Sequence, residues 1–251
     1  MSLQPRVIPS LLINGRKLIK TIRFKSPIYI GDPINAVKIF NDKEVDEIAI
    51  FDIYAWKKEI QFDYLKEIFE EAFMPALYGG GVKCIDDFEK LYKIGVEKVS
   101  ISTNAHNDQL IKDAVRIFGS ASVVVTIDIN KSIFGKYNIY TNNFRKKMKL
   151  DIINFIDDLE ELGIGELILN FINRDGTRLG YDINFIANIS SRCSIPIIAL
   201  GGAGNLDDIV KLLKNTEVRA AAASSLFVFH NNNNSVLINY PDRKIIKEKI
   251  L

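Results

Sequence analysis

The sequence is poor in the residues that form disulfides or bind soft metals. It contains two cysteines, Cys84 and Cys193, and two histidines, His106 and His230, among 251 residues. The cysteines lie far apart and form no CxxC pattern, which argues against a disulfide framework and for a reducing compartment. Two cysteines and two histidines provide too few ligands for a zinc site, and we expect neither a metal nor a cofactor.

Two further absences concern partners and location. The 33 basic and 31 acidic residues nearly balance, and no basic stripe with interleaved aromatic residues is present, so we predict no nucleic-acid binding. No apolar run approaches about 18 residues, the length of a membrane span. The first residues also lack the apolar segment of a signal peptide. We therefore expect no membrane association and a cytoplasmic location.

Apolar residues are present in an ordered pattern and make up 47% of the chain, enough for a sizeable core. Eight short apolar runs are predicted as strands, at residues 6–13, 47–53, 75–79, 98–102, 122–128, 166–171, 195–200 and 218–224. Helical patterns separate them, and such alternation indicates a parallel sheet covered by helices. Eight units in a chain of this length favour a closed (β/α)₈ barrel over an open sheet.

Three segments depart from this alternation. Residues 17–30 are basic and rich in β-forming residues, and we interpret them as a long loop that could contain a hairpin. Residues 131–149 form an irregular polar segment that could turn back at Gly135. After the last strand comes the polar run 230–234, then the extended-looking segment 235–241, so that only residues 243–251 could be helical.

Glycine and hydroxyl residues recur at one offset along the chain. Gly201 follows Gly79 by 122 residues, and Ser225 follows Thr103 by the same 122 residues. This repetition suggests an internal duplication, although two ordinary βα loops could coincide by chance. We predict one barrel domain over residues 1–251, built from half-barrels at about 1–120 and 121–229 with an atypical tail at 230–251.

The repeated glycines also suggest a function. Glycines that follow a strand and precede a helix leave backbone N–H groups free to bind a phosphate. Runs of this kind stand at 79–81 and 201–204, each followed by hydroxyl residues at the end of the next strand. Each glycine run with the hydroxyl residues that follow it is called a cradle below, the first at 79–81 and the second at 201–204. Active sites of such barrels lie at the C-terminal strand ends, so two cradles there would fit a substrate with a phosphate at each end. The alternative is two tight βα turns that bind nothing.

Asp128 ends an apolar strand, where an unpaired carboxylate is costly to bury unless it lies at the open mouth of the barrel. One interpretation is a general acid or base, and the other is an aspartate that caps a helix or anchors a loop. Further candidates stand at other C-terminal strand ends: Leu12, Asp52, Ser102, Asn170 and Asp175.

Five motifs in order resemble one enzyme family. They are YGGGV at 78–82, KVSIST at 98–103, VVVTID at 123–128, NRDGT at 173–177 and ALGGAG at 199–204. Together they resemble HisF, the cyclase subunit of imidazole glycerol phosphate synthase, over residues 6 to about 229. The resemblance implies a duplicated (β/α)₈ barrel with a HisH-type glutaminase docked on its N-terminal face. Ammonia would cross the barrel and, in a lyase and cyclase reaction of histidine biosynthesis, act on a bis-phosphorylated substrate at the far face.

The resemblance also implies roles for single residues. Gly81 and Thr103 would bind the phosphate at one end of the substrate. The phosphate at the other end would be bound by Gly176, Gly202, Ser224 and Ser225. Asp128 would be the acid or base. Lys20 matches a loop lysine near the substrate, and Asp52, Asn170 and Asp175 would complete the substrate face.

Departures from the family pattern weigh against cyclisation by its mechanism. The family has a second catalytic aspartate at the end of strand one, where this chain has Leu12. Leucine cannot transfer a proton, and loss of one member of an acid/base pair typically costs about 10²–10⁴-fold in rate. Ser102 replaces the family's asparagine before Thr103, and the tail segment replaces the usual C-terminal helix.

The opposite barrel end keeps the family pattern. Arg6, Glu47, Lys98 and Glu166 match four charged residues that ring the ammonia entrance in the family. Side chains alternate between the two faces of a strand, so every second residue lies on the same face. By this rule Arg6, Lys98 and Glu166 each come first, at the N-terminal end, among the residues of their strand that share one face. The four residues could be an ammonia gate or only a structural ring of ion pairs.

Three functions therefore stay open. The first is a HisF-type cyclase subunit that still uses Asp128. The second is an ammonia-conducting docking subunit for an ATP-dependent amidotransferase that makes acetamidino surface sugars, because the 15–32 loop, Leu12 and the 236–241 tail resemble HisF-like proteins of that kind. The third is a phosphate-sugar isomerase of the sister HisA type, which also needs two carboxylates and is disfavoured equally by Leu12.

Overall fold

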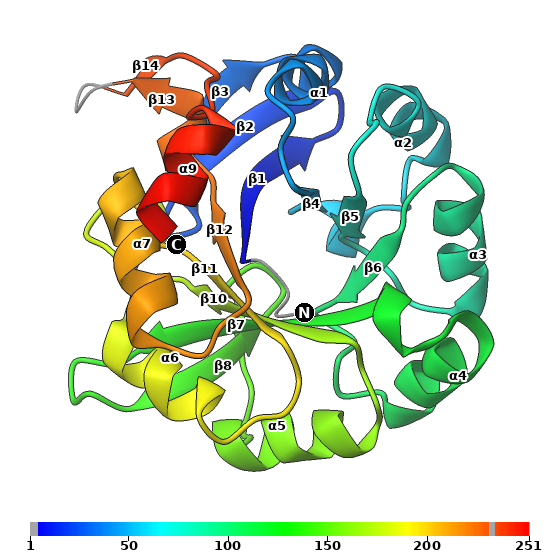
Figure 1. The fold of residues 1–251 in the computed structure, drawn as a ribbon. Helices are drawn as coiled ribbons and strands as arrows, with labels where there is room; N and C mark the ends of the chain where they lie inside the picture. The colour runs from blue at the N-terminus through cyan, green and yellow to red at the C-terminus, as the bar shows by residue number, and fades with distance from the viewer. Residues whose placement is uncertain (1–4, 231–233, 251) are drawn as a thin grey trace.

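The computed structural model describes residues 5–230 and 234–250, and its centre is a closed barrel of parallel strands (Figure 1). In barrel order the strands are β1 (Arg6–Asn14), β4 (Ile48–Asp52), β5 (Ala76–Gly79), β6 (Lys98–Ile101), β7 (Val123–Lys131), β10 (Glu166–Phe171), β11 (Ile197–Leu200) and β12 (Ala220–Ala223). Parallel pairing of β12 with β1 and of β7 with β10 closes the ring. The predicted (β/α)₈ barrel is thereby confirmed. The repeated landmarks at Gly79 and Gly201 end or follow β5 and β11, which are four barrel strands apart.

Helices follow the strands and cover the outside of the barrel (Figure 1). They are α1 (Pro33–Asp42), α2 (Phe62–Phe69), α3 (Ile85–Lys93), α4 (Asp108–Phe118), α5 (Ile152–Glu161), α6 (Ile183–Ser190), α7 (Leu206–Asn215) and the single turn α8 (Ser225–Val228), with 3₁₀ turns at Ala55–Lys57 and Ser120–Ser122. Local sequence fixes where several of them begin. Asp32, for example, caps α1 by accepting a hydrogen bond from the Asn35 N–H at 2.9 Å, next to Pro33 in the first turn.

The strands bury apolar side chains on both faces. Their outward-facing residues pack against the helices in one large core. Their inward-facing residues form a second, smaller cluster inside the barrel: Ile8, Ala49, Leu77, Val124, Ile168, Ile198, Leu200, Ala220 and Ala222. Burial on both faces explains why the strands are nearly continuous apolar runs in the sequence.

Two segments predicted as irregular are hairpins. Residues 17–30, interpreted as a long loop, form β2 (Lys17–Ile22) and β3 (Lys25–Gly31), and β2 also pairs with β1. In the second segment, β7 continues to Lys131 and turns back into β8 (Tyr137–Thr141), followed by β9 (Lys146–Lys147). In both segments the hairpin that the sequence allowed is confirmed, and the prediction of an irregular loop is wrong. Since β1 and β7 extend beyond the barrel, their free edges need partner strands to satisfy the backbone hydrogen bonds.

The C-terminal tail ends in a helix at the one place in it where the sequence allowed one. The expectation that only residues 243–251 could be helical agrees with α9 (Arg243–Ile250), which lies beside α7 and buries Ile246, so the tail does include a C-terminal helix (Figure 1). It is reached through the short paired strands β13 (Phe229–His230) and β14 (Ser235–Val236). Tyr240 fixes the approach, because its hydroxyl donates to the Val7 carbonyl at 3.0 Å. The asparagines at 231–233 lie outside the described residues.

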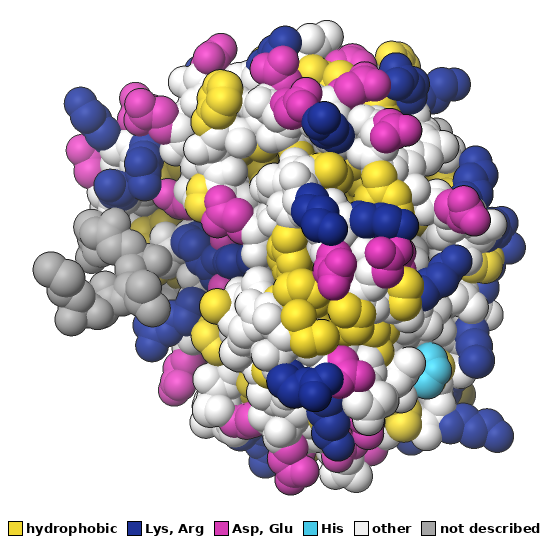
Figure 2. All heavy atoms as spheres, turned by 90° about the vertical axis from the view of Figure 1, so that its right-hand side faces the viewer, with side chains coloured by type: hydrophobic (Ala, Val, Ile, Leu, Met, Phe, Trp, Pro, Cys, Tyr) yellow, Lys and Arg dark blue, Asp and Glu magenta, His cyan; other side chains and the backbone are white. Residues whose placement is uncertain are grey.

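The outer face over α2, α3 and α4 carries a band of hydrophobic side chains between charged ones (Figure 2). The charges pair along α3, where Lys90 and Asp86 approach to 2.6 Å at helical spacing. Such pairs are typical of a solvated helix face. In the part of the chain that the structure describes, no helix has both the length and the apolar character of a membrane span.

Candidate functional site

A cavity of about 240 Å³ opens at the C-terminal ends of the barrel strands. It collects side chains from βα loops that are distant in the sequence. Ten of the predicted site residues line it: Leu12, Lys20, Asp52, Gly81, Ser102, Thr103, Asp128, Asn170, Asp175 and Ser224. The sequence prediction therefore placed most of its candidates at one site.

Three predicted phosphate-binding residues do not line this cavity: Gly176, Gly202 and Ser225. The β2–β3 hairpin lies directly against Gly176, where an added Cβ would stand 2.7 Å from the Thr21 carbonyl oxygen. The Ser225 hydroxyl is buried and has no hydrogen-bond partner among the described residues. The first cradle thus opens into the cavity, whereas the second reaches it only through Ser224. Phosphate binding at either cradle stays a prediction.

The first cradle is shaped by glycines packed against the segment after β4. Gly81 has φ +73°, and a Cβ on it would lie 2.9 Å from the Ala55 Cβ. Thr103 also lines the cavity, and its Oγ1 accepts a hydrogen bond from the Asn142 N–H of a neighbouring loop at 3.4 Å. Lys83 adds a cation to the lining. Backbone N–H groups, a hydroxyl and a lysine are suitable groups for a phosphate.

Replacement of Gly81 tests how tightly this cradle is built. Gly81→Ala is expected to lower the free energy of unfolding by about 3 kcal/mol, because it combines a left-handed backbone with a steric clash. Gly135→Ala is the matched control, since Gly135 has φ +81° but nothing within 4 Å of the added Cβ. It should cost about 1 kcal/mol. Urea denaturation measures both, and equal losses would contradict the proposed close packing.

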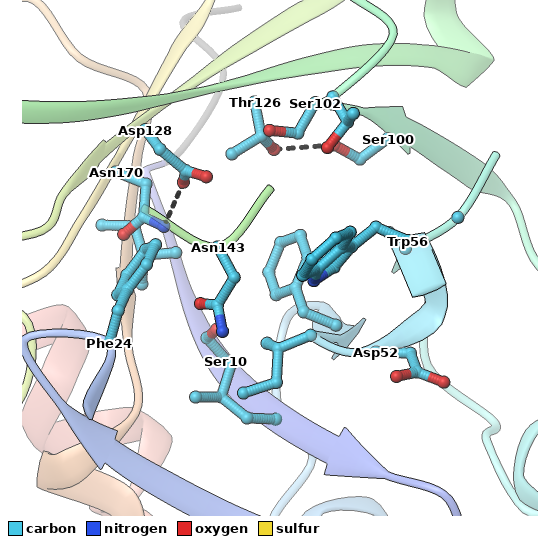
Figure 3. A pocket seen from close by; sticks show the side chains of 18 of the residues that line it. Ser10, Phe24, Asp52, Trp56, Ser100, Ser102, Thr126, Asp128, Asn143 and Asn170 are labelled. Atoms are coloured by element: carbon cyan, nitrogen blue, oxygen red, sulfur yellow. Dashed lines mark hydrogen bonds between the residues drawn. The ribbon is translucent and has the colours of Figure 1, made fainter. Parts of the chain in front are cut away.

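Asp128 is the carboxylate best suited to proton transfer. It is 9% exposed, and its Oδ1 accepts from the Asn170 Nδ2 at 2.8 Å (Figure 3). Burial is the main cause that raises its pKa to about 7, and the negative charge of Asp175 acts in the same direction. Hydrogen bonds from Asn170 and Ser102 oppose that rise. A carboxyl group with a pKa near neutrality can serve as either acid or base.

The raised pKa of Asp128 predicts a pH-dependent stability. Its ordinary pKa is near 3.8, so between about pH 4 and pH 7 the folded chain holds a proton that the unfolded chain releases. Stability therefore falls as pH rises through this window, by up to about 4 kcal/mol. We expect Asp128→Asn to be more stable than wild type at pH 8 and about equally stable at pH 4. Denaturation at the two pH values measures this, and an equal stability at pH 8 would contradict it.

Asp175 is held by the hairpin and is poorly placed for proton transfer. Lys20 forms an ion pair with it, and the Thr21 hydroxyl and the Phe24 N–H donate to it at 3.1 and 3.3 Å. The Lys20 ammonium also donates to the Thr21 carbonyl at 2.7 Å and is fully buried. Lys20 thus lies in the cavity lining as predicted, while its charge fastens the β2–β3 hairpin to the βα loop after β10.

No carboxylate stands at the end of β1, where Leu12 lines the cavity. Asp52 lies in the same lining, and burial is the main cause that raises its pKa. Its Oδ1 accepts from the Tyr54 N–H at 3.0 Å, and its carboxylate points away from Asp128 (Figure 3). The site therefore has no second carboxylate directed at Asp128 from β1.

Several residues of the lining were not predicted from the sequence. Trp56 and Phe24 lie on opposite sides of the cavity, with Asn143 between them (Figure 3). Asn143 comes from the turn between β8 and β9, where three successive residues have positive φ. The available signal was Trp56, the single tryptophan of the chain, four residues beyond a barrel strand. Ser10, Ser100 and Thr126 form a hydroxyl layer at the cavity floor, where the Ser100 and Thr126 hydroxyls are 2.7 Å apart.

The four charged residues predicted at the opposite barrel end do meet there. Arg6 bonds to both Glu47 and Glu166, and the Lys98 ammonium lies 2.9 Å from a carboxylate oxygen of each. Burial raises the pKa of Glu47 despite the two neighbouring cations. Acids and bases thus alternate in a closed ring, hereafter the charged ring. An ammonia gate at this place remains a prediction.

Comparisons with known proteins agree with the fold and the motifs. The family described as "Histidine biosynthesis protein" matches residues 6–233. A relative named "Putative imidazole glycerol phosphate synthase subunit hisF2", from Pseudomonas aeruginosa, is 47% identical over 240 residues, which cover 94% of this chain and 96% of the relative. "Imidazole glycerol phosphate synthase subunit HisF" from Streptococcus mutans is 33% identical over 228 residues, covering 90% and 91%. The chain belongs to the histidine biosynthesis protein family and is a homologue of HisF cyclase subunits of imidazole glycerol phosphate synthase.

Proposed function

We propose that this chain receives ammonia from a HisH-type glutaminase at the N-terminal barrel face and delivers it to the cavity at the C-terminal face. The observation that supports this best is the order of layers along the barrel axis. The charged ring closes one end, the small apolar cluster fills the middle, and the hydroxyl layer and Asp128 face the cavity.

This order suits ammonia better than ammonium. Moving an ion such as ammonium from water into an apolar interior has a large desolvation free energy, whereas that of a neutral molecule such as ammonia is far smaller. Several interior positions carry the smallest apolar side chain, at Ala49, Ala220 and Ala222. A glutaminase docked over the charged ring would therefore release ammonia into an interior that favours its neutral form.

At the cavity we propose a phosphorylated substrate. The cradle around Gly81 and Thr103 would hold one phosphate, and Gly176, Gly202, Ser224 and Ser225 would hold a second one in a bis-phosphorylated substrate of the HisF type. Asp128 would transfer protons during attack by ammonia, in keeping with its raised pKa.

A second candidate follows from Leu12. A subunit that keeps the charged ring but lacks the β1 carboxylate could pass ammonia on to a further enzyme, such as an ATP-dependent amidotransferase for acetamidino surface sugars. In that case the chain would dock and conduct without cyclising a substrate itself.

The experiment combines the chain with the HisH-type glutaminase of the same organism. Sedimentation velocity is expected to show a 1:1 complex, and glutamine or free ammonia is then supplied with the bis-phosphorylated HisF substrate. Turnover supports the first candidate. A stable complex without turnover supports the second, and failure to form a complex at micromolar concentrations would contradict the proposed ammonia transfer.

A further inference from the structure

Positive charge is concentrated in one segment of the chain, although the charges nearly cancel in total. Residues 131–149, hereafter the basic hairpin, run from the end of β7 through β8 and β9 and contain six basic residues and no acidic one. All six side chains are exposed: Lys131, Lys136, Arg145, Lys146, Lys147 and Lys149. We propose that the basic hairpin is the docking site for an acidic segment of the enzyme that consumes the delivered ammonia. This inference rests on the second candidate function and adds the surface that its partner contacts.

A groove of about 560 Å³ lies between the basic hairpin and the first turns of α5 and α6, and is here called the hairpin groove (Figure 1). Lys136, Lys147 and Lys149 line it. Lys131 approaches Asp182 at 3.9 Å, whereas none of these three lysines forms an ion pair within the part of the chain that the structure describes. Positive charge that the chain itself leaves uncompensated attracts an acidic partner.

The acidic residue Asp151 also lines the hairpin groove, but its carboxylate is engaged elsewhere. It caps α5 by accepting hydrogen bonds from the Ile153 and Asn154 N–H groups at 3.0 and 3.2 Å. Its negative charge therefore stabilises the N-terminal end of that helix and leaves the lysines of the groove without a partner carboxylate.

The hairpin groove is fixed before any partner binds. The Tyr137 ring stacks on Phe185 of α6 with the ring centroids 3.8 Å apart, and the Tyr137 hydroxyl donates to Asp182 at 2.9 Å. The antiparallel pairing of β8 with β7 holds the opposite edge of the hairpin. A surface that is already ordered loses less conformational entropy on association.

Shape and apolar residues favour a protein over a membrane or a nucleic acid. Ile133 and Phe134, in the turn just before Lys136, are 95% and 91% exposed. Apolar anchors beside charged groups are typical of protein interfaces. The hairpin groove is concave and carries Met148 and Leu150 between its lysines, which suits a protruding chain segment with acidic and apolar side chains. A flat lipid surface would leave this hollow empty, and a phosphate backbone would gain nothing from its apolar lining.

The position of the basic hairpin identifies the partner as the ammonia-consuming enzyme. Asn143, in the turn between β8 and β9, lines the cavity, and the Arg145 guanidinium lies 5.5 Å from the centroid of the Trp56 ring in the same lining. The Lys131 N–H donates to Asn173 in the loop after β10 at 3.4 Å. A partner on the basic hairpin would therefore stand beside the mouth of the cavity. Ammonia could then pass directly between the two sites without entering water, where it would be protonated.

Charge reversal in the hairpin groove tests the docking site. The double variant Lys147→Glu, Lys149→Glu is combined with the purified ATP-dependent amidotransferase of the same organism, in the presence of the glutaminase. We expect at least a tenfold loss of affinity by calorimetry, and a smaller loss in about 0.5 M salt, where the charges are screened. The double variant Lys112→Glu, Lys211→Glu is the matched control, because it changes the net charge equally at exposed positions of α4 and α7. Its affinity should equal that of wild type.

The source of ammonia provides a second measurement. Amidation is followed once with glutamine as the nitrogen donor and once with an ammonium salt. Transfer from glutamine requires the docked complex, whereas free ammonia reaches the amidotransferase from solution. The groove double variant should therefore reduce glutamine-dependent amidation about tenfold and leave ammonium-dependent amidation unchanged.

Several results would overturn the proposal. One is equal affinity of wild type and the groove double variant for the amidotransferase, and another is an equal loss in the control variant. Phosphatidylglycerol vesicles and a single-stranded oligonucleotide are titrated in parallel, and binding of either one that depends on Lys147 and Lys149, without amidotransferase binding, would assign the groove to another class of partner. Failure to bind the glutaminase would reject the ammonia transfer itself. A normal glutaminase complex that does not bind the amidotransferase would reject the docking site alone.

Discussion

Leu12→Asp is expected to raise ammonia-dependent turnover of the bis-phosphorylated HisF substrate by about 100-fold or more over wild type. The reason is that it restores a second proton-transfer group at the end of β1, in a cavity that already contains Asp128. Leu12 is only half-buried and lines the cavity, so a carboxylate there can stay solvated and the fold should tolerate it. Product formation followed by absorbance or chromatography measures the effect.

Leu12→Asn is the matched control, because it has the size and polarity of the aspartate but cannot act as an acid or base. Its turnover should not rise above that of wild type. Adding Asp128→Asn to Leu12→Asp should remove the gain, because both carboxylates are then required. If the folded Leu12→Asp chain binds phosphate esters but stays inactive, the cavity has lost the family reaction for reasons beyond the β1 carboxylate.

Glu47→Ala is expected to cost about 3 kcal/mol of stability, or roughly 5–10 °C in Tm. Its side chain is 2% exposed and contacts both Arg6 and Lys98, so truncation leaves two cations with Glu166 as the remaining acid of the charged ring. Removing one partner of a buried ion pair leaves an uncompensated charge away from water. Differential scanning calorimetry measures the shift in Tm.

Glu67→Ala provides the comparison for this variant. Glu67 also lies 2.8 Å from an arginine, Arg16, but both side chains are largely exposed, so its loss should cost less than about 0.5 kcal/mol. If Glu47→Ala is as mild as Glu67→Ala, the charged ring contributes little to stability. Its retention would then need the ammonia-gate explanation rather than the structural one.

Most of the barrel could be predicted from the sequence because its signals are local. Near-continuous apolar strands, helical periods and glycines at strand ends are each visible within ten residues, and the barrel follows from repeating them eight times. The four residues of the charged ring were implied by the family resemblance, and alternation along the strands independently supported Arg6, Lys98 and Glu166. Asp128 was identified as a carboxylate at the end of a buried strand.

The details of the site depended on contacts between loops that the sequence does not reveal. Lys20 and Asp175 are 155 residues apart, and only the fold shows that they pair and that the hairpin covers Gly176. Trp56 carries no motif, so its place in the cavity lining emerges only when segment 52–56 packs behind the cradle. The tail helix was uncertain for the same reason, because α9 is short and is positioned by α7 and Tyr240.

The sequence by itself therefore determined the barrel through strand and helix periodicity, and its family motifs pointed to the four residues of the charged ring and to the absence of a carboxylate at Leu12. The tertiary structure decided which glycine run opens into the cavity, how the pKa of Asp128 is raised and which side chains line the wall beside the glycines at 79–81. These properties arise from burial and from contacts between distant loops. Neither exists until the chain has folded.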